Sequence, residues 1–178
     1  MKNRSRFLSV PVLFGVISLG LQNCASGPEV RSQAYAKLKN ERTYEYEFPV
    51  VWKALEEALR NYKVTDRDPD EVDDLEMKQL TTRSLKTDWV YGQSRDKYIE
   101  YKINDTPRKQ YLQLRYQYSV HVKKVIGGTT VKVRTQEEIE RLKDDGTSMG
   151  YESIDEVDTS RENELLDKIG KAILSAAP

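Results

Sequence analysis

Strict alternation of apolar and polar side chains runs from Leu112 to Lys123 and predicts one long β-strand from about Gln110 to Val125. Gly127 and Gly128 follow, and residues 129–135 alternate again. Because both glycines tolerate positive φ, the two segments predict an antiparallel hairpin with one apolar and one polar face. An apolar face of this length has to be covered by another layer of the protein. The apolar positions of the first strand are Leu112, Leu114, Tyr116, Tyr118, Val120 and Val122.

Two amphipathic helices are predicted on either side of this hairpin in the sequence. Residues 50–62 carry apolar side chains at helical spacing, and Pro49 before them suits the first turn of a helix. Thr159 and Glu162 have the spacing of a capping box at the start of the second helix. The apolar stripes are Val51, Leu55, Ala58, Leu59 and Tyr62 in the first helix and Leu165, Leu166, Ile169, Ala172 and Ile173 in the second.

Three further segments, residues 43–48, 85–91 and 98–103, alternate in the manner of strands, and residues 63–67 are expected to form a short strand. Residues 136–142 are ambiguous between a continuing strand and a short helix. Together the patterns predict an α+β fold, in which helices pack on one face of an antiparallel sheet and the other face is wet.

The first 23 residues have the layout of a secretory signal. Lys2, Arg4 and Arg6 precede an apolar stretch at residues 7–21, which is shorter than the roughly 20 residues that a transmembrane helix needs. Cys24 follows directly, and it is the single cysteine of the chain.

Cys24 is predicted to become the first mature residue and to carry lipid on its sulfur. The segment before it resembles a bacterial lipoprotein signal, in which Leu21 fits the usual box. Gln22 and Asn23 depart from that box in a way similar to the relaxed boxes of spirochaete lipoproteins. A lone cysteine has no partner for an intramolecular disulfide. The alternative is an ordinary leader beside a free or buried cysteine. Lipidation implies anchoring to a membrane. Ala25 and Ser26 follow with no aspartate, which in the sorting rule of enteric bacteria favours the cell outer membrane, on either its periplasmic or its surface side.

The mature chain has the size and charge of a single soluble domain on a tether. Removing residues 1–23 takes away three of the 29 basic residues and none of the 29 acidic ones, which leaves 155 residues with a formal charge of −3. That length is enough for one domain with a core, and the lack of a basic excess argues against a nucleic-acid partner. Residues 24–42 are expected to be the acylated cysteine and a flexible linker, and residues 43–178 a single domain.

Four segments carry a resemblance to a known family: Phe48–Trp52, Tyr62–Val64, Leu85–Trp89 and Leu165–Gly170. In this order they resemble the helix-grip domain of the BamC-like (NlpB or DapX type) outer-membrane lipoproteins, over about residues 44–174. The resemblance implies a helix-grip fold with the order β-α-β-β-β-β-α. Because BamC belongs to the outer-membrane barrel-assembly machine, it also implies contacts with proteins of the cell envelope. BamC has two such domains and a long N-terminal segment, whereas one domain and a short linker are expected here.

An acidic segment at residues 66–76 is the sharpest cluster of charge. Four of its aspartates fall at positions 1, 3, 5 and 9 of a calcium-binding loop, which also needs glycine at position 6 and glutamate at position 12. Glu71 and Met77 stand at those two positions, so a solvated loop is the simpler interpretation and weak calcium binding is the alternative. The four aspartates are Asp66, Asp68, Asp70 and Asp74.

The sequence predicts no cofactor and no enzymatic activity. His121 is the only histidine, which leaves no second imidazole and no thiolate for a zinc site in the mature domain. No nucleophile elbow or phosphate-binding loop occurs in the sequence. His121 lies on the polar side of the long predicted strand, and this side is the candidate contact face for a protein partner. Its candidates are Arg115, Gln117, His121 and Lys123.

Eleven tyrosines against three phenylalanines suggest a second use for the predicted layers. An amphipathic groove between helix and sheet would hold a lipid or another apolar ligand, although a packed core explains the same residues more simply. The candidates for lining such a groove are Trp52, Trp89, Tyr101, Tyr116 and Tyr118.

The leading hypothesis is therefore a membrane-anchored, non-enzymatic lipoprotein that works through protein contacts in envelope or outer-membrane assembly. Carriage of a lipid or other apolar ligand is one alternative. A surface-exposed lipoprotein that engages host molecules is another.

Overall fold

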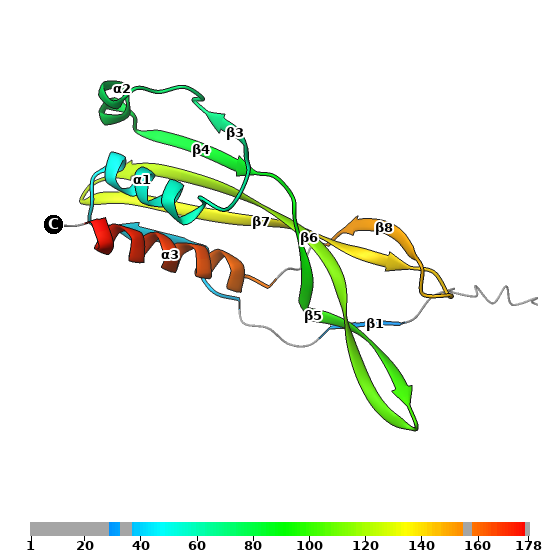
Figure 1. Cartoon of the computed structure of the whole chain (residues 1–178). Helices are drawn as coiled ribbons and strands as arrows, with labels where there is room; N and C mark the ends of the chain where they lie inside the picture. The colour runs from blue at the N-terminus through cyan, green and yellow to red at the C-terminus, as the bar shows by residue number, and fades with distance from the viewer. Residues whose placement is uncertain (1–28, 33–36, 155–157, 177–178) are drawn as a thin grey trace, which may run out of the picture.

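The computed structural model describes residues 29–32, 37–154 and 158–176, so Cys24 and its leader lie outside the described residues. Figure 1 shows the arrangement of the elements. In chain order they are β1 (Val30–Ser32), β2 (Glu41–Tyr44), α1 (Phe48–Ala58), β3 (Val64–Asp68), α2 (Asp74–Gln79), β4 (Thr82–Thr87), β5 (Val90–Ile103), β6 (Thr106–Val125), β7 (Gly128–Leu142), β8 (Ser148–Ser153) and α3 (Ser160–Ala176).

The 20-residue strand β6 is the centre of an eight-stranded antiparallel sheet. Its first half pairs with β5 and its second half with β4 on the same side, while β7 pairs with it on the other side. The remaining strands extend the edges: β3 pairs with β4, β2 and β8 pair with β7, and β1 pairs with β5. The second half of β6 therefore lies in a layer with the order β3, β4, β6, β7, β2.

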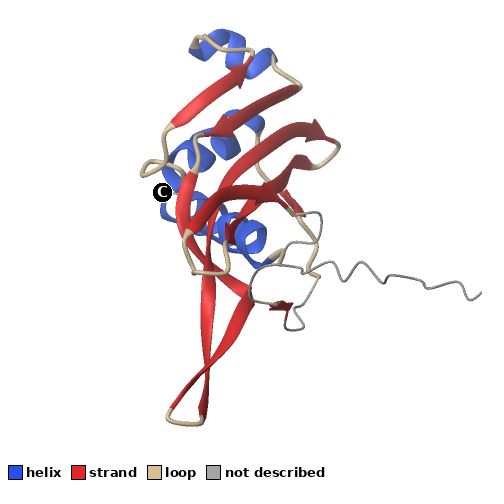
Figure 2. Cartoon of the chain, turned by 90° about the vertical axis from the view of Figure 1, so that its right-hand side faces the viewer, coloured by secondary structure: helices blue, strands red, loops and turns tan. Residues whose placement is uncertain are grey.

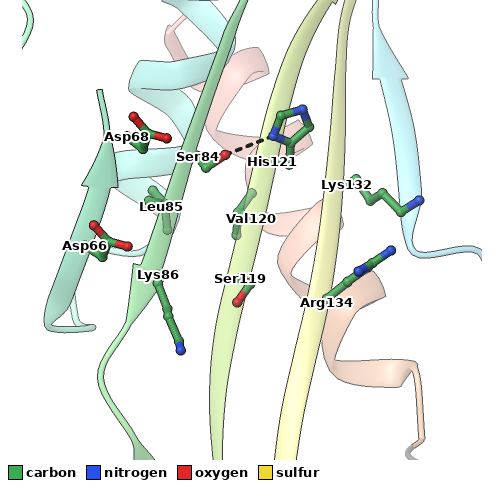
Figure 3. Close-up of a pocket in the computed structure, with 10 residues that line it drawn as sticks. All are labelled: Asp66, Asp68, Ser84, Leu85, Lys86, Ser119, Val120, His121, Lys132 and Arg134. Carbon is green, nitrogen blue, oxygen red and sulfur yellow. Dashed lines mark hydrogen bonds between the residues drawn. The ribbon is translucent and has the colours of Figure 1, made fainter. Parts of the chain in front are cut away.

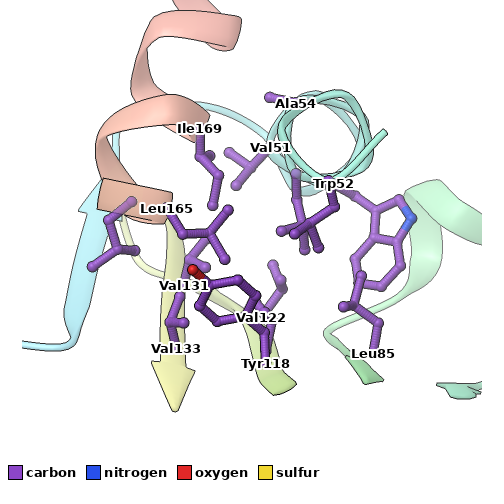
Figure 4. Close-up of a cluster of buried hydrophobic side chains, with 14 of the residues drawn as sticks. Val51, Trp52, Ala54, Leu85, Tyr118, Val122, Val131, Val133, Leu165 and Ile169 are labelled. Carbon is purple, nitrogen blue, oxygen red and sulfur yellow. The ribbon is translucent and has the colours of Figure 1, made fainter. Parts of the chain in front are cut away.

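Helices α1 and α3 pack against each other and against β6, β7 and β2, all on one face of the sheet. Figure 4 shows the side chains that meet there. Burying this many aliphatic and aromatic groups is the main stabilising term of the fold. The hydrophobic residues with 0% exposure are Val51, Leu55, Val122, Val131, Val133, Leu166 and Ile169.

The predicted α+β architecture, with helices on one face of an antiparallel sheet, is confirmed. Both helices and the hairpin at Gly127 and Gly128 form as predicted, and residues 136–142 continue the strand β7. The short strand expected at residues 63–67 forms as β3, but the expected element order was too simple, because β1, α2 and β8 are added to it. The segments at 85–91 and 98–103 also divide differently: β4 ends at Thr87, and one long strand covers 90–103.

Part of the expected flexible linker at residues 24–42 is ordered into the fold. β1 lies within it and pairs with β5, and β2 already begins at Glu41. The Leu38 N–H donates a hydrogen bond to the Thr159 Oγ1 at 2.7 Å. These backbone hydrogen bonds cannot be read from side-chain periodicity, which is why the segment resembled a linker.

Helix α3 does not use the predicted capping box at its start. The Glu162 carboxylate faces β7, where its Oε1 accepts a hydrogen bond from the Thr135 N–H at 3.1 Å. Asp158 accepts from the Ser160 N–H at 2.9 Å instead. A complete capping box forms at α2, between Asp73 and Glu76.

Strands β5 and β6 continue beyond the helices as a two-stranded arm, which both views show projecting from the body (Figures 1 and 2). We define the arm as residues 99–110. Its tip is a two-residue turn at Asn104 and Asp105, whose φ angles of 48° and 61° match the right-handed twist of the strands. Neither helix covers it, and every residue from Glu100 to Gln110 is exposed.

No helix in the described part of the chain is long and apolar enough to cross a membrane.

Candidate functional site

The sheet face that carries no helix is the candidate functional site. Cross-strand partners in an antiparallel sheet point to the same face, so the register places side chains from several strands side by side. Ser84, His121 and Lys132 form one row across β4, β6 and β7. Lys86, Ser119 and Arg134 form the next row.

These two rows line an open hollow of about 430 Å³, shown in Figure 3. The hollow follows the twist of the sheet, and side chains of the edge strand β3 lie along one side of it. Its lining residues are Asp66, Asp68, Ser84, Leu85, Lys86, Ser119, Val120, His121, Lys132 and Arg134.

Four cations run along the central strands of this face, and we call them the cationic strip: Lys86, Lys123, Lys132 and Arg134. Lys132 lies 3.6 Å from the Glu41 carboxylate on the edge strand β2. The other three form no ion pair with another described residue. Acidic groups stand at the edges instead, on β2 and β3. The centre of the face therefore carries positive charge that the described residues do not neutralise.

A serine and a histidine meet within the hollow. The Ser84 Oγ lies 2.9 Å from the His121 Nδ1. Nucleophilic catalysis by such a pair needs a group that orients the second ring nitrogen and donors for an oxyanion. No hydrogen bond to the His121 Nε2 is made by a described residue, and the surrounding strand N–H groups are used in the ladder with β4 and β7. The arrangement favours binding by charge and hydrogen bonds.

Two of the four predicted contact residues belong to a different, internally satisfied cluster. The Arg115 guanidinium lies against Glu138, with Nε to Oε2 at 2.7 Å, and its centre stands 4.7 Å from the Trp89 ring. The hydrogen bond to Glu138 is the main reason that the pKa of Arg115 is raised. Gln117 is only 6% exposed and donates to the Gln136 amide oxygen at 3.0 Å. The prediction that Gln117 is exposed was therefore wrong, whereas His121 and Lys123 are exposed.

The five predicted groove residues do not line one cavity, because the structure places them in three regions. Trp52, Tyr116 and Tyr118 are in the core, with exposures of 2%, 8% and 4%. Trp89 contacts Arg115 on the opposite face of the sheet. Tyr101 is 42% exposed on the arm, although a core position was expected.

The buried tyrosines pack against one another instead of leaving a groove. The ring of Tyr118 makes edge contacts with Tyr62 and Tyr116, at centroid distances of 5.6 and 5.5 Å. Burial raises the pKa of Tyr116 to about 12 and also raises the pKa of Tyr118. Both hydroxyls therefore stay protonated at neutral pH, as expected for core residues.

The four aspartates with calcium-loop spacing are also separated. Asp66 and Asp68 lie on β3 beside the hollow, whereas Asp74 begins α2. Asp73 is occupied as the cap of α2, where it accepts hydrogen bonds from two backbone N–H groups. Within residues 29–32, 37–154 and 158–176, no three His, Cys, Asp or Glu side chains are grouped so that they could hold a metal ion.

Sequence reasoning missed Lys86, Lys132 and Arg134 as members of the site. A signal for two of them was present, because Val131 and Val133 alternate with Lys132 and Arg134 after the glycine turn. Pairing across that turn would have set both cations beside the polar side of β6. The position of Lys86 could not be predicted in this way, because no hairpin turn connects β4 to β6 in the sequence and the two strands pair only in the folded chain.

No protein-family model matches the chain, and no curated protein sequence matches it.

Proposed function

We propose that this protein is a lipid-anchored, non-enzymatic interaction module of the bacterial cell envelope, and that its cationic strip binds an acidic segment of a protein partner. The single observation that carries the proposal is the bare sheet face with its central, unneutralised cations. The resemblance to BamC-like lipoproteins supports a setting in envelope or outer-membrane assembly.

The two faces of the sheet are used differently, and this contrast supports a binding role. One face is filled by α1 and α3 and holds the hydrophobic core. The other has polar rows, an open hollow and three cations that form no ion pair with a described residue. Lys86 and Arg134 flank Ser119 from the two neighbouring strands, and the like charges gathered on this face repel one another. An acidic segment lying along the strip would offset this repulsion and gain charge-assisted hydrogen bonds.

The leader and Cys24 support the membrane anchor. Two or more acyl chains hold a protein at a bilayer far more firmly than one chain does. A module that is held at the membrane meets envelope partners at a high local concentration, so a weak electrostatic contact suffices for function.

Co-purification from detergent-solubilised membranes tests the binding role. We expect the native protein to retain a partner that a glutamate-rich peptide displaces, and the double variant Lys86→Glu with Arg134→Glu to lose it. The matched control is Lys168→Glu with Lys171→Glu, which makes the same charge change on exposed positions of α3.

Loss in the strip variant with retention in the control supports the proposal. Equal retention by both variants, or a native protein that purifies without any partner, contradicts it. Recovery of barrel-assembly components as the partner would assign the module to that machine.

A further inference from the structure

We propose that the arm is a second membrane contact, whose tip lies in the lipid headgroup region of the same membrane that holds the N-terminal anchor. This inference rests on the proposed anchoring through Cys24. It adds a defined orientation of the domain on the bilayer.

The exposed chemistry of the arm suits a lipid interface. Tyr101 and Ile103 are 42% and 52% exposed and lie on one side of the ribbon, beside Arg108, which is the cross-strand partner of Tyr101. Lys102 and Lys109 lie on the other side. Aromatic and aliphatic groups next to Lys and Arg are the composition that settles at the boundary between headgroups and acyl chains.

The tip carries an excess of positive charge. The arm contains three basic residues, Lys102, Arg108 and Lys109, and two acidic ones, Glu100 and Asp105. Glu100 is paired with Arg31 at 2.6 Å, which leaves Asp105 to offset the three cations. Basic residues near an anionic bilayer are attracted to its negative surface potential. A two-stranded ribbon with exposed apolar groups is also only marginally stable in water by itself. A lipid surface would cover the apolar side and attract the cations together.

The register of β1 directs the N-terminal chain toward the same tip. Val30 pairs with Ile99 and Ser32 pairs with Lys97, so β1 runs from the tip side toward the body. Glu29, the first described residue, therefore lies on the tip side of Val30. Figure 1 shows β1 alongside the base of the arm.

The lengths allow the anchor and the tip to reach one bilayer. Cys24 lies six positions before Val30, and six residues span at most about 20 Å. From Ile99, the partner of Val30, to Ile103 the strand rises about 13 Å toward the tip. A membrane that holds the lipid on Cys24 is thus within reach of Tyr101 and Ile103 when the arm points at it.

A matched control site exists at the other end of β6. Ile126 forms the turn between β6 and β7 and is fully exposed. It has the same side chain as Ile103 but is separated from it by the whole 20-residue strand, roughly 65 Å along the chain direction. Lipid contact at both positions is incompatible with an arm-first orientation.

The test uses the acylated protein in vesicles of phosphatidylethanolamine and phosphatidylglycerol, after mass spectrometry has established that Cys24 is modified. Ile103→Cys and Ile126→Cys each receive an environment-sensitive fluorophore on the introduced thiol, since the sulfur of Cys24 is blocked. We expect a blue-shifted emission and quenching by lipid-borne nitroxide at position 103. We also expect iodide quenching there to be at least about threefold weaker than at position 126.

Equal iodide quenching at both positions, or nitroxide quenching at both, overturns the arm contact while the anchor stands. An unmodified Cys24 overturns the proposed anchoring itself and is recognised before any label is read. As a second variant, Tyr101→Ser with Ile103→Cys should lose most of the blue shift. An unchanged shift would show that Tyr101 makes no lipid contact and would contradict the inference.

Discussion

Arg83 is a buried cation that fixes the acidic segment to the sheet. It lies on β4 with 4% exposure, and its Nε donates to the Pro69 carbonyl oxygen at 3.0 Å. A second nitrogen of the guanidinium donates to the Asp70 carbonyl oxygen. The Cζ atom of the Arg83 guanidinium lies 4.4 Å from the centre of the Trp52 ring. Arg83 thus holds the acidic segment through the backbone carbonyls of Pro69 and Asp70 and not through a carboxylate.

Replacing Arg83 tests this role. Arg83→Met keeps much of the volume but removes the donors, so we expect the free energy of unfolding to fall by about 1–3 kcal/mol. Limited proteolysis should then cut the segment between β3 and β4 first. Arg60→Met is the control, because Arg60 is 68% exposed in an ion pair with Glu57, and its loss should cost less than about 0.5 kcal/mol. Equal destabilisation by the two variants would contradict the assignment.

Glu164 gives the fold a defined sensitivity to acid. Its carboxylate accepts hydrogen bonds from two nitrogens of Arg95, at 2.7 and 3.1 Å, and this pairing is the main reason that its pKa is lowered from 4.5. A lowered folded-state pKa adds stability above the unfolded-state value of 4.5. That stability is lost as the pH falls below 4.5 through the folded-state pKa.

We therefore expect Glu164→Gln to lower the free energy of unfolding at pH 7 by no more than about 1 kcal/mol, because the pair is on the surface. The difference from the native protein should shrink to nothing as denaturation is measured at progressively lower pH beneath 4.5. Glu71→Gln, at an exposed position, should show no such difference at any pH. A Glu164→Gln deficit that persists in strong acid would argue for a packing role instead.

At the scale of elements, the turn between β6 and β7 depends on two glycines for different reasons. Gly127 has a φ of 85°, and a Cβ there would meet nothing within 4 Å. Gly128 has a φ of 154°, and its Cβ would lie 2.1 Å from the Tyr44 carbonyl oxygen. The second glycine is required because β2 pairs closely with the start of β7.

The two alanine variants should separate these causes. Gly127→Ala is expected to cost about 1 kcal/mol for the left-handed backbone alone. Gly128→Ala is expected to cost about 3 kcal/mol or more, because backbone strain is joined by a clash with β2. Thermal or chemical denaturation of both variants measures the difference. Similar values would mean that β2 does not approach the turn as described.

Periodicity predicted well which face of a strand or helix a residue lies on. It predicted less well which of those faces another element buries. The alternation along β6 correctly assigned the six even-numbered residues from Leu112 through Val122 to the core side of the sheet. The same rule put Tyr101 on a core face, but α1 and α3 do not extend over the arm. Alternation reports which side a residue takes, whereas coverage depends on where the helices lie. The prediction that Gln117 is exposed was wrong for the converse reason, because its neighbours on the polar face bury it.

The candidate site was predictable only in part for the same physical reason. His121 and Lys123 follow from local alternation, and Lys132 and Arg134 follow from pairing across a glycine turn. Lys86 lies on β4, which pairs with β6, and Asp66 lies on β3, which pairs with β4. Both pairings form only when the chain folds. Non-local strand pairing is not encoded in any local pattern, so the hollow emerges only in three dimensions.

At the scale of the whole molecule, the proposed anchor, the proposed lipid contact and the proposed partner site lie in separate places. The described chain begins beside the arm, the arm tip carries exposed tyrosine, isoleucine and basic residues, and the cationic strip lies on the second half of β6 and its neighbours. From Thr106 at the tip to Ser119, which lies between Lys86 and Arg134 of the strip, the strand rises roughly 43 Å. An arm-first orientation would hold the strip away from the bilayer, where a partner can reach it.

The central claim is that Cys24 attaches this module to a membrane, and mass spectrometry of the mature N-terminus tests it most directly. In protein purified from the membranes of its native cells, the account predicts an N-terminal peptide that begins at Cys24 and carries both a diacylglyceryl group on sulfur and an amide-linked acyl chain. A peptide that begins elsewhere, or a Cys24 with a free thiol, would contradict the anchor and the membrane orientation that depends on it.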